Sequence, residues 1–112
     1  MIEDLSAYHH PLANLFALPT SAAGLAAYRL RDEQIEFYRE NGYLSGIRVL
    51  TEKQIEVLRQ DLTELIDPAH TGHHLFYEFH SNESPDPAKT LFHALGAWRI
   101  AKSFHDLLWN PA

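Results

Sequence analysis

The chain has 112 residues, of which 9 are Lys or Arg, 15 are Asp or Glu, 8 are His and none is Cys. This length suits one domain with its own core, and 46% hydrophobic with 21% charged residues excludes a wholly disordered chain. The lack of Cys excludes a disulfide scaffold, a Cys-based zinc site, an iron–sulfur cluster and a thiol nucleophile. A formal charge of −6 argues against a nucleic-acid partner, which requires a basic face.

Residues 1–28 differ in composition from the rest and predict a loosely ordered leader, with a short helix near 21–28 packed on the body as the alternative. The stretch 5–28 lacks Asp, Glu, Lys and Arg, but prolines and polar residues interrupt it, so we expect no membrane span. Glu3 and Asp4 stand where a secretory signal would be basic. The sequence therefore predicts a cytoplasmic protein with residues 29–112 as its domain.

Two similar stretches, 30–36 and 50–56, each predict the start of a helix. In the second, Thr51 and Gln54 have the spacing of a capping box. In the first, Arg31 stands where a capping hydroxyl would help, so we expect Asp32 to cap one residue later. We expect the first helix to end at Asn41, with Gly42 as a left-handed cap.

The rest of the chain predicts further alternation of strands and helices. A short strand is expected at 43–49, and the second helix carries an apolar stripe and ends before Pro68. Residues 75–80 and 90–95 predict a hairpin-like pair of strands, and 97–109 predicts a helix. This order gives an α+β fold with few strands.

Histidines gather between the second helix and the first hairpin strand. Imidazole and carboxylate groups this close are typical metal ligands, but their spacing matches no standard ligand motif. We therefore favour solvated loop histidines and a strand-face pair, with a metal site as the alternative; the residues are His70, His73, His74, Glu78 and His80.

Other candidate groups favour structural roles. His93 has no partner that the sequence reveals, and the adjacent His105 and Asp106 diverge by about 100° on a helix. Arg99, after Trp98, has the planar fork that binds anions, although a bond within the fold is the simpler interpretation. No phosphate-binding loop, dinucleotide fingerprint or nucleophile motif is present.

Several segments together resemble one enzyme family. Residues 30–44 read LRDEQIEFYRENGYL, the strand and helix start at 49–54 follow, and 92–100 and 104–111 read FHALGAWRI and FHDLLWNP. This pattern resembles the N-terminal portion of the phytanoyl-CoA dioxygenase family, over about residues 30–112. Arg31 departs from the usual Thr, which affects only the helix cap.

The resemblance implies an N-terminal helix and strand portion of a double-stranded β-helix (jelly-roll) oxygenase, with the barrel incomplete. Such enzymes use iron(II) and 2-oxoglutarate to hydroxylate a small organic substrate. Their iron is held by an H-x-D and a distant His, which this chain lacks. We therefore assign no catalytic, cofactor-binding or metal-binding residue, and we expect the chain alone to bind neither cofactor and to be inactive.

Two other functions remain open at this stage. The first is a small non-catalytic α+β interaction module that self-associates through uncovered strands. The second is a histidine metal-binding protein that uses the four histidines between residues 70 and 80.

Overall fold

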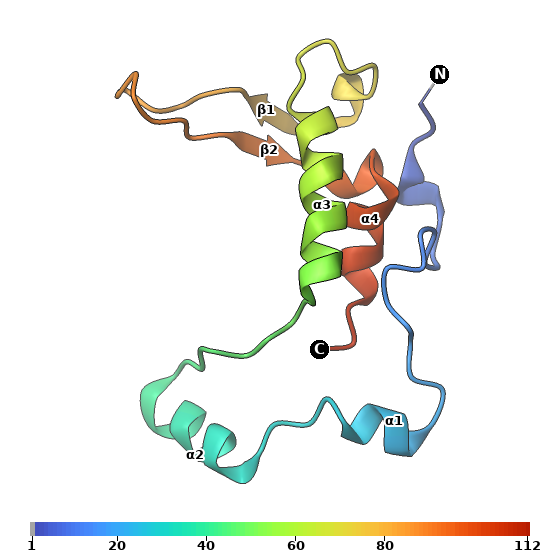
Figure 1. Ribbon diagram of the computed structural model, residues 1–112, viewed down its shortest axis with the longest axis vertical. Coiled ribbons are helices and arrows are strands. Elements are labelled where there is room, and N and C mark those ends of the chain that lie inside the picture. The colour runs from blue at the N-terminus through green and yellow to red at the C-terminus, as the bar shows by residue number, and fades with distance from the viewer. Residues whose placement is uncertain (1) are drawn as a thin grey trace.

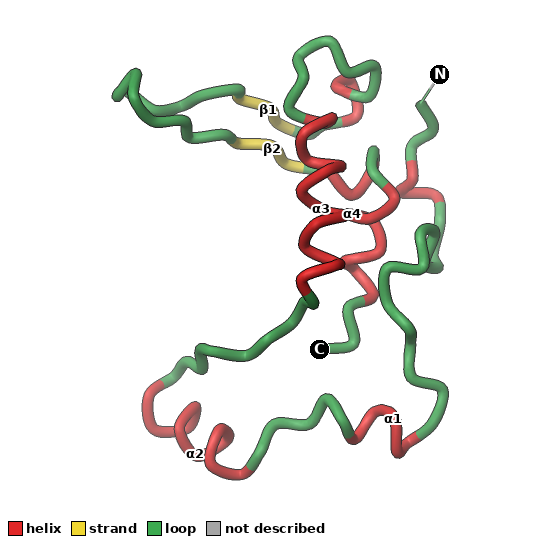
Figure 2. The backbone as a smooth tube through the Cα atoms, viewed as in Figure 1, coloured by secondary structure: helices red, strands yellow, loops and turns green. Residues whose placement is uncertain are grey.

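The computed structural model describes residues 2–112 as a mixed helix and strand protein with a wide, open outline (Figure 1). Its Cα radius of gyration is 17.3 Å, whereas a compact domain of this length has about 13 Å. Long loops join the elements (Figure 2). In chain order they are η1 (Leu5–Ala7), α1 (Ala22–Ala26), α2 (Asp32–Asn41), α3 (Glu52–Leu65), η2 (His73–Leu75), β1 (Glu78–His80), β2 (His93–Leu95), η3 (Ala97–Arg99), α4 (Lys102–Asp106) and η4 (Leu107–Trp109), where η marks a 3-10 turn.

The predicted starts of the two longer helices are confirmed, with one correction. The Thr51 hydroxyl accepts from the Gln54 N–H at 3.2 Å, and the Gln54 side chain accepts from the Thr51 N–H at 2.9 Å, which completes a capping box. Helix α2 begins at Asp32, so Asp32 is not its cap. Arg31 occupies that position, and only the Gln34 side chain closes the turn, by accepting from the Arg31 N–H. Gly42 ends α2 in the left-handed conformation, as predicted.

Two predicted elements are wrong. Residues 43–49 form no strand within the part of the chain that the structure describes, because no neighbouring strand pairs with them there. The single helix predicted over 97–109 is instead divided into η3, α4 and η4. The break lies at Ala101, whose extended backbone (φ −108°, ψ 129°) cannot continue a helix.

The predicted hairpin is confirmed, although its strands are shorter than expected. β1 pairs antiparallel with β2, and His80 lies directly opposite His93. Leu75 falls in the turn η2 before the strand. The hairpin projects from the end of the α3–α4 pair (Figure 1). An α+β class is therefore correct, and no barrel forms among residues 2–112.

A small apolar core lies where α3, η2 and η3 meet. Leu65, Leu75 and Ile100 are its buried members. Gly72 approaches it so closely that a Cβ atom there would lie 2.6 Å from Cγ2 of Ile100. A side chain at this position would therefore force the core apart.

The N-terminal segment is tied to α4 by one buried carboxylate. Asp106 is 0% exposed, and its two oxygens accept the backbone N–H groups of Leu12, Ala13 and Leu15 at 2.6, 3.1 and 3.0 Å. The first half of the predicted leader is thus bonded to the C-terminal elements. Helix α1, further along it, has no buried residue. No helix in the described residues is long and apolar enough to cross a membrane.

We predict that Asp106→Asn weakens this connection. The new amide NH₂ would face backbone N–H donors, so at least one buried donor would lose its acceptor, at a cost of about 1–3 kcal/mol in unfolding free energy. Hydrogen exchange should show lost protection at the amides of Leu12, Ala13 and Leu15. Glu56→Gln is the control, because it removes the same charge from an exposed site. Unchanged protection in the Asp106 variant would contradict the assignment.

Candidate functional site

The three loop histidines singled out by the sequence each form a hydrogen bond with the backbone. His70 Nδ1 accepts the Gly72 N–H at 3.0 Å. His73 Nε2 donates to the Leu65 carbonyl at 3.0 Å, and His74 Nδ1 donates to the Thr71 carbonyl at 2.9 Å. These bonds close the loop after α3. The loop histidines therefore shape the chain locally.

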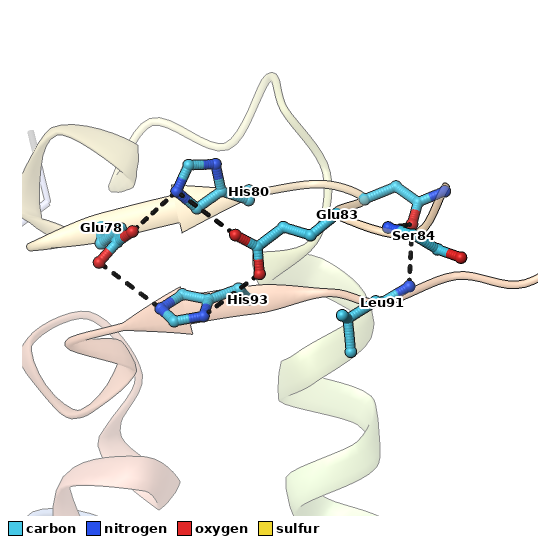
Figure 3. A network of polar contacts seen from close by, with 7 residues as sticks. Glu78, His80, Glu83, Ser84, Leu91 and His93 are labelled. Carbon is cyan, nitrogen blue, oxygen red and sulfur yellow. Dashed lines mark hydrogen bonds and ion pairs between the residues drawn. The ribbon is translucent and has the colours of Figure 1, made fainter. Parts of the chain in front are cut away.

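A different group of titratable side chains meets on the hairpin (Figure 3). His80 Nε2 lies 2.9 Å from Glu78 Oε1 and 3.9 Å from Glu83 Oε1. His93 Nε2 lies 3.7 Å from Glu78 Oε2, and His93 Nδ1 lies 3.5 Å from Glu83 Oε2. Two carboxylates and two imidazoles thus alternate in a closed ring, which we call the hairpin ring (Glu78, His80, Glu83 and His93).

The strand register creates the hairpin ring. Glu78 and His80 are two residues apart in β1, so their side chains lie on the same face of the hairpin. His93 pairs with His80, so the second imidazole lies beside them on β2. Glu83 arrives from the loop, where its own N–H donates to the Leu91 carbonyl at 2.8 Å. The strand pattern in the sequence places Glu78 and His80 on one face. It does not reveal Glu83 and His93 beside them, because only the exact register of the two strands joins these residues.

The hairpin ring is open to solvent, since its side chains are 39–50% exposed. Among residues 2–112, no group of three or more His, Cys, Asp or Glu side chains is arranged to hold a metal ion. With no H-x-D in the sequence either, the described residues do not fit the iron centre of the resembled family.

Arg99 is fully engaged within the fold, as the simpler interpretation expected. Its Nε and Nη2 donate to the Asp4 carboxylate, and its Nη1 donates to the Leu75 carbonyl at 2.8 Å. The guanidinium carbon also lies 4.6 Å from the centre of the Tyr77 ring. Arg99 is thus not available to an anionic ligand in this structure.

The Arg99 guanidinium holds the pKa of Asp4 well below its usual range, with help from the Ser6 N–H, which also donates to this carboxylate. In turn the carboxylate raises the pKa of Arg99. This ion pair joins the N-terminal segment to η3 and is a second tether beside Asp106.

His105 lies beside Asp106 and is also 0% exposed. Its Nε2 donates to the Tyr8 carbonyl at 3.1 Å, and its ring lies 4.8 Å from that of Trp109. The other ring nitrogen, Nδ1, has no hydrogen-bond partner among residues 2–112 and lies 4.0 Å from Asp106 Oδ1. His105 therefore supports the same N-terminal attachment.

A cavity of about 280 Å³ lies beside the core, between α3 and α4. Its charged lining comes from Asp61, Glu64 and Lys102, and the Ser103 hydroxyl donates to Asp61. This bond links α3 directly to α4.

Comparisons with protein-family models, curated proteins and solved structures found no match to this chain.

We predict that Asp4→Asn lowers the melting temperature near neutral pH. Because the folded-state pKa of Asp4 is depressed, its stabilising effect is full above the pKa of the unfolded chain, about 3.9, and is lost as the pH falls below it. The difference in melting temperature between parent and variant should stay constant from pH 7 to 5 and narrow below about pH 4.

Asp32→Asn serves as the control for this experiment, because Asp32 is exposed on the first turn of α2. A difference that persists unchanged to pH 2 in the Asp4 variant would contradict the ion-pair assignment.

Proposed function

We propose that this chain is the N-terminal portion of an iron(II)- and 2-oxoglutarate-dependent dioxygenase of the phytanoyl-CoA dioxygenase type. The resemblance of residues 30–44, 92–100 and 104–111 motivates the proposal. The complete enzyme would hydroxylate a small organic substrate while 2-oxoglutarate becomes succinate and CO₂. We propose a cytoplasmic location on the same basis.

The observation that carries the proposal is the unpaired segment at 43–49. It runs from α2 to α3 without joining a strand in the described structure. Tyr43 is 57% exposed and Val49 is 47% exposed. An unpaired segment with large exposed apolar side chains gains stability when another strand or layer covers it. A jelly-roll barrel would supply such a layer.

The hairpin supports the same interpretation. β1 and β2 pair only with each other among residues 2–112, so each leaves one edge open. Tyr77, just before β1, is 61% exposed, and Leu95, at the end of β2, is 54% exposed. Two strands are too few for an independently stable sheet, and further strands added at these edges would complete one.

The proposal gives this portion a supporting role and not a catalytic one. The described residues do not fit the iron centre, so no reaction step is assigned to them. Their task would be to pack α3, α4 and the hairpin against the barrel. We therefore expect the 112-residue chain to be inactive.

We predict that the chain does not bind iron(II) and 2-oxoglutarate together. An anaerobic titration followed by calorimetry should show no saturable 1:1 uptake of both compounds. The control is the double variant His80→Gln/His93→Gln, since weak iron uptake at exposed hairpin imidazoles would disappear in it. Stoichiometric binding of both compounds by the parent chain would contradict the proposal.

The alternative function is a non-catalytic interaction module that uses the same open edges. It predicts self-association that saturates at one defined dimer and requires no iron. Analytical ultracentrifugation distinguishes the two. An incomplete barrel predicts association that continues to grow with concentration, because uncovered edges and apolar surface have no closed arrangement.

A further inference from the structure

The His93 side chain contacts two carboxylates, which the backbone pairing of its strand does not require. Each of its two ring nitrogens faces a carboxylate, Nε2 facing Glu78 at 3.7 Å and Nδ1 facing Glu83 at 3.5 Å (Figure 3). A neutral imidazole carries hydrogen on only one nitrogen and a lone pair on the other. One carboxylate would then face that lone pair, and this contact is repulsive. Only the imidazolium form presents N–H donors to both carboxylates.

His80, in contrast, does not need hydrogen on both ring nitrogens to satisfy its carboxylate contacts. Only its Nε2 faces the carboxylates, at 2.9 Å from Glu78 and 3.9 Å from Glu83, so a neutral imidazole with hydrogen on Nε2 satisfies the contact. The two rings lie edge to face with centroids 5.7 Å apart, where two positive charges would repel each other. The arrangement therefore suits one added proton, on His93.

The net charge of the hairpin ring also favours a protonated His93. With both imidazoles neutral, the ring carries two negative charges, on Glu78 and Glu83, which repel each other. One proton on His93 halves the net charge and places a cation between the two carboxylates. These four side chains lie within 4.0 Å of one another. Another ion pair of the hairpin, Lys89–Asp86 at 3.6 Å, lies further out in the loop and includes none of them.

The hairpin ring joins parts of the hairpin that few backbone bonds hold. The strands share only three residue pairs, and the Glu83 N–H donates to Leu91 further out. His93 reaches back to Glu78 on β1 and outward to Glu83 in the loop. Any change in its charge therefore acts on both strands and on the loop together.

We propose that the hairpin ring is a proton-operated clasp, in which one proton bound at His93 closes the outer half of the β1–β2 hairpin and its loss loosens that half. Histidine is the side chain that ordinarily changes charge between about pH 5 and 8. The loop after β1 would thus become more mobile as the pH rises through this interval, while the α3–α4 body stays unchanged.

The test is amide hydrogen exchange by NMR on the full chain between pH 5 and 8, expressed as protection factors so that the intrinsic pH dependence is removed. The Glu83 amide reports the outer hairpin, and the Tyr77 amide, which donates to the Leu95 carbonyl at 2.8 Å, reports its base. We expect protection at Glu83 to rise about two- to five-fold as His93 is protonated, the effect of a cross-strand charge pair. Protection at Tyr77 should change less.

Two variants test the origin of the effect. Glu83→Gln and His93→Gln should both make protection at residue 83 independent of pH, because one removes the carboxylate and the other the proton-binding group. His9→Gln and Glu56→Gln are the matched controls, since both sites are exposed and lie outside the hairpin.

A parent chain whose protection at Glu83 is constant from pH 5 to 8 would overturn the proposal. A protection factor at residue 83 that still varies with pH in both hairpin variants would overturn the proposal as well. If either variant lost the hairpin altogether, the imidazole ¹⁵N shifts of His93 in the parent chain would decide. The proposal requires both nitrogens to be protonated whenever the Glu83 amide is protected, and a neutral His93 in that state would refute it.

Discussion

The fold depends on a buried carboxylate near the end of the chain. Asp106 lies inside the structure and accepts three backbone N–H groups from residues 12–15. A buried carboxylate is stable inside a protein only when its hydrogen bonds are satisfied. The folded position of α4 therefore depends on the N-terminal segment, and the position of that segment depends on α4. His105 and the Arg99–Asp4 ion pair strengthen the same attachment. Around this connection the α3–α4 body and its small core assemble.

The parts outside that body explain why the molecule is so open. Helices α1 and α2 lie on a long segment of chain that runs away from α3 (Figure 1). Neither helix has a buried residue. The hairpin extends from the opposite end with both edges uncovered. A body that is well bonded at its centre but exposes apolar side chains at both ends favours our proposal that further strands cover it. The hairpin ring adds a charge-controlled joint at one of those ends.

The sequence predicts features that depend on neighbouring residues. The Thr51–Gln54 capping box and the left-handed Gly42 follow from short-range rules, and the hairpin follows from apolar runs around a turn. The sequence does not predict contacts between residues that are far apart along the chain. The break at Ala101 separates η3, which carries Arg99, from α4, which carries Asp106, and both side chains bond to the N-terminal segment, 91–95 residues away. The hairpin ring likewise requires the exact pairing of His80 with His93, which no local pattern specifies.

The central claim, that this chain is one portion of a larger oxygenase, is tested most directly by reading the coding DNA downstream of codon 112. Our account predicts that the same frame, or a shifted one, continues into segments of alternating apolar residues that contain an H-x-D and, well beyond it, a second His. A stop codon followed by unrelated sequence would contradict the claim.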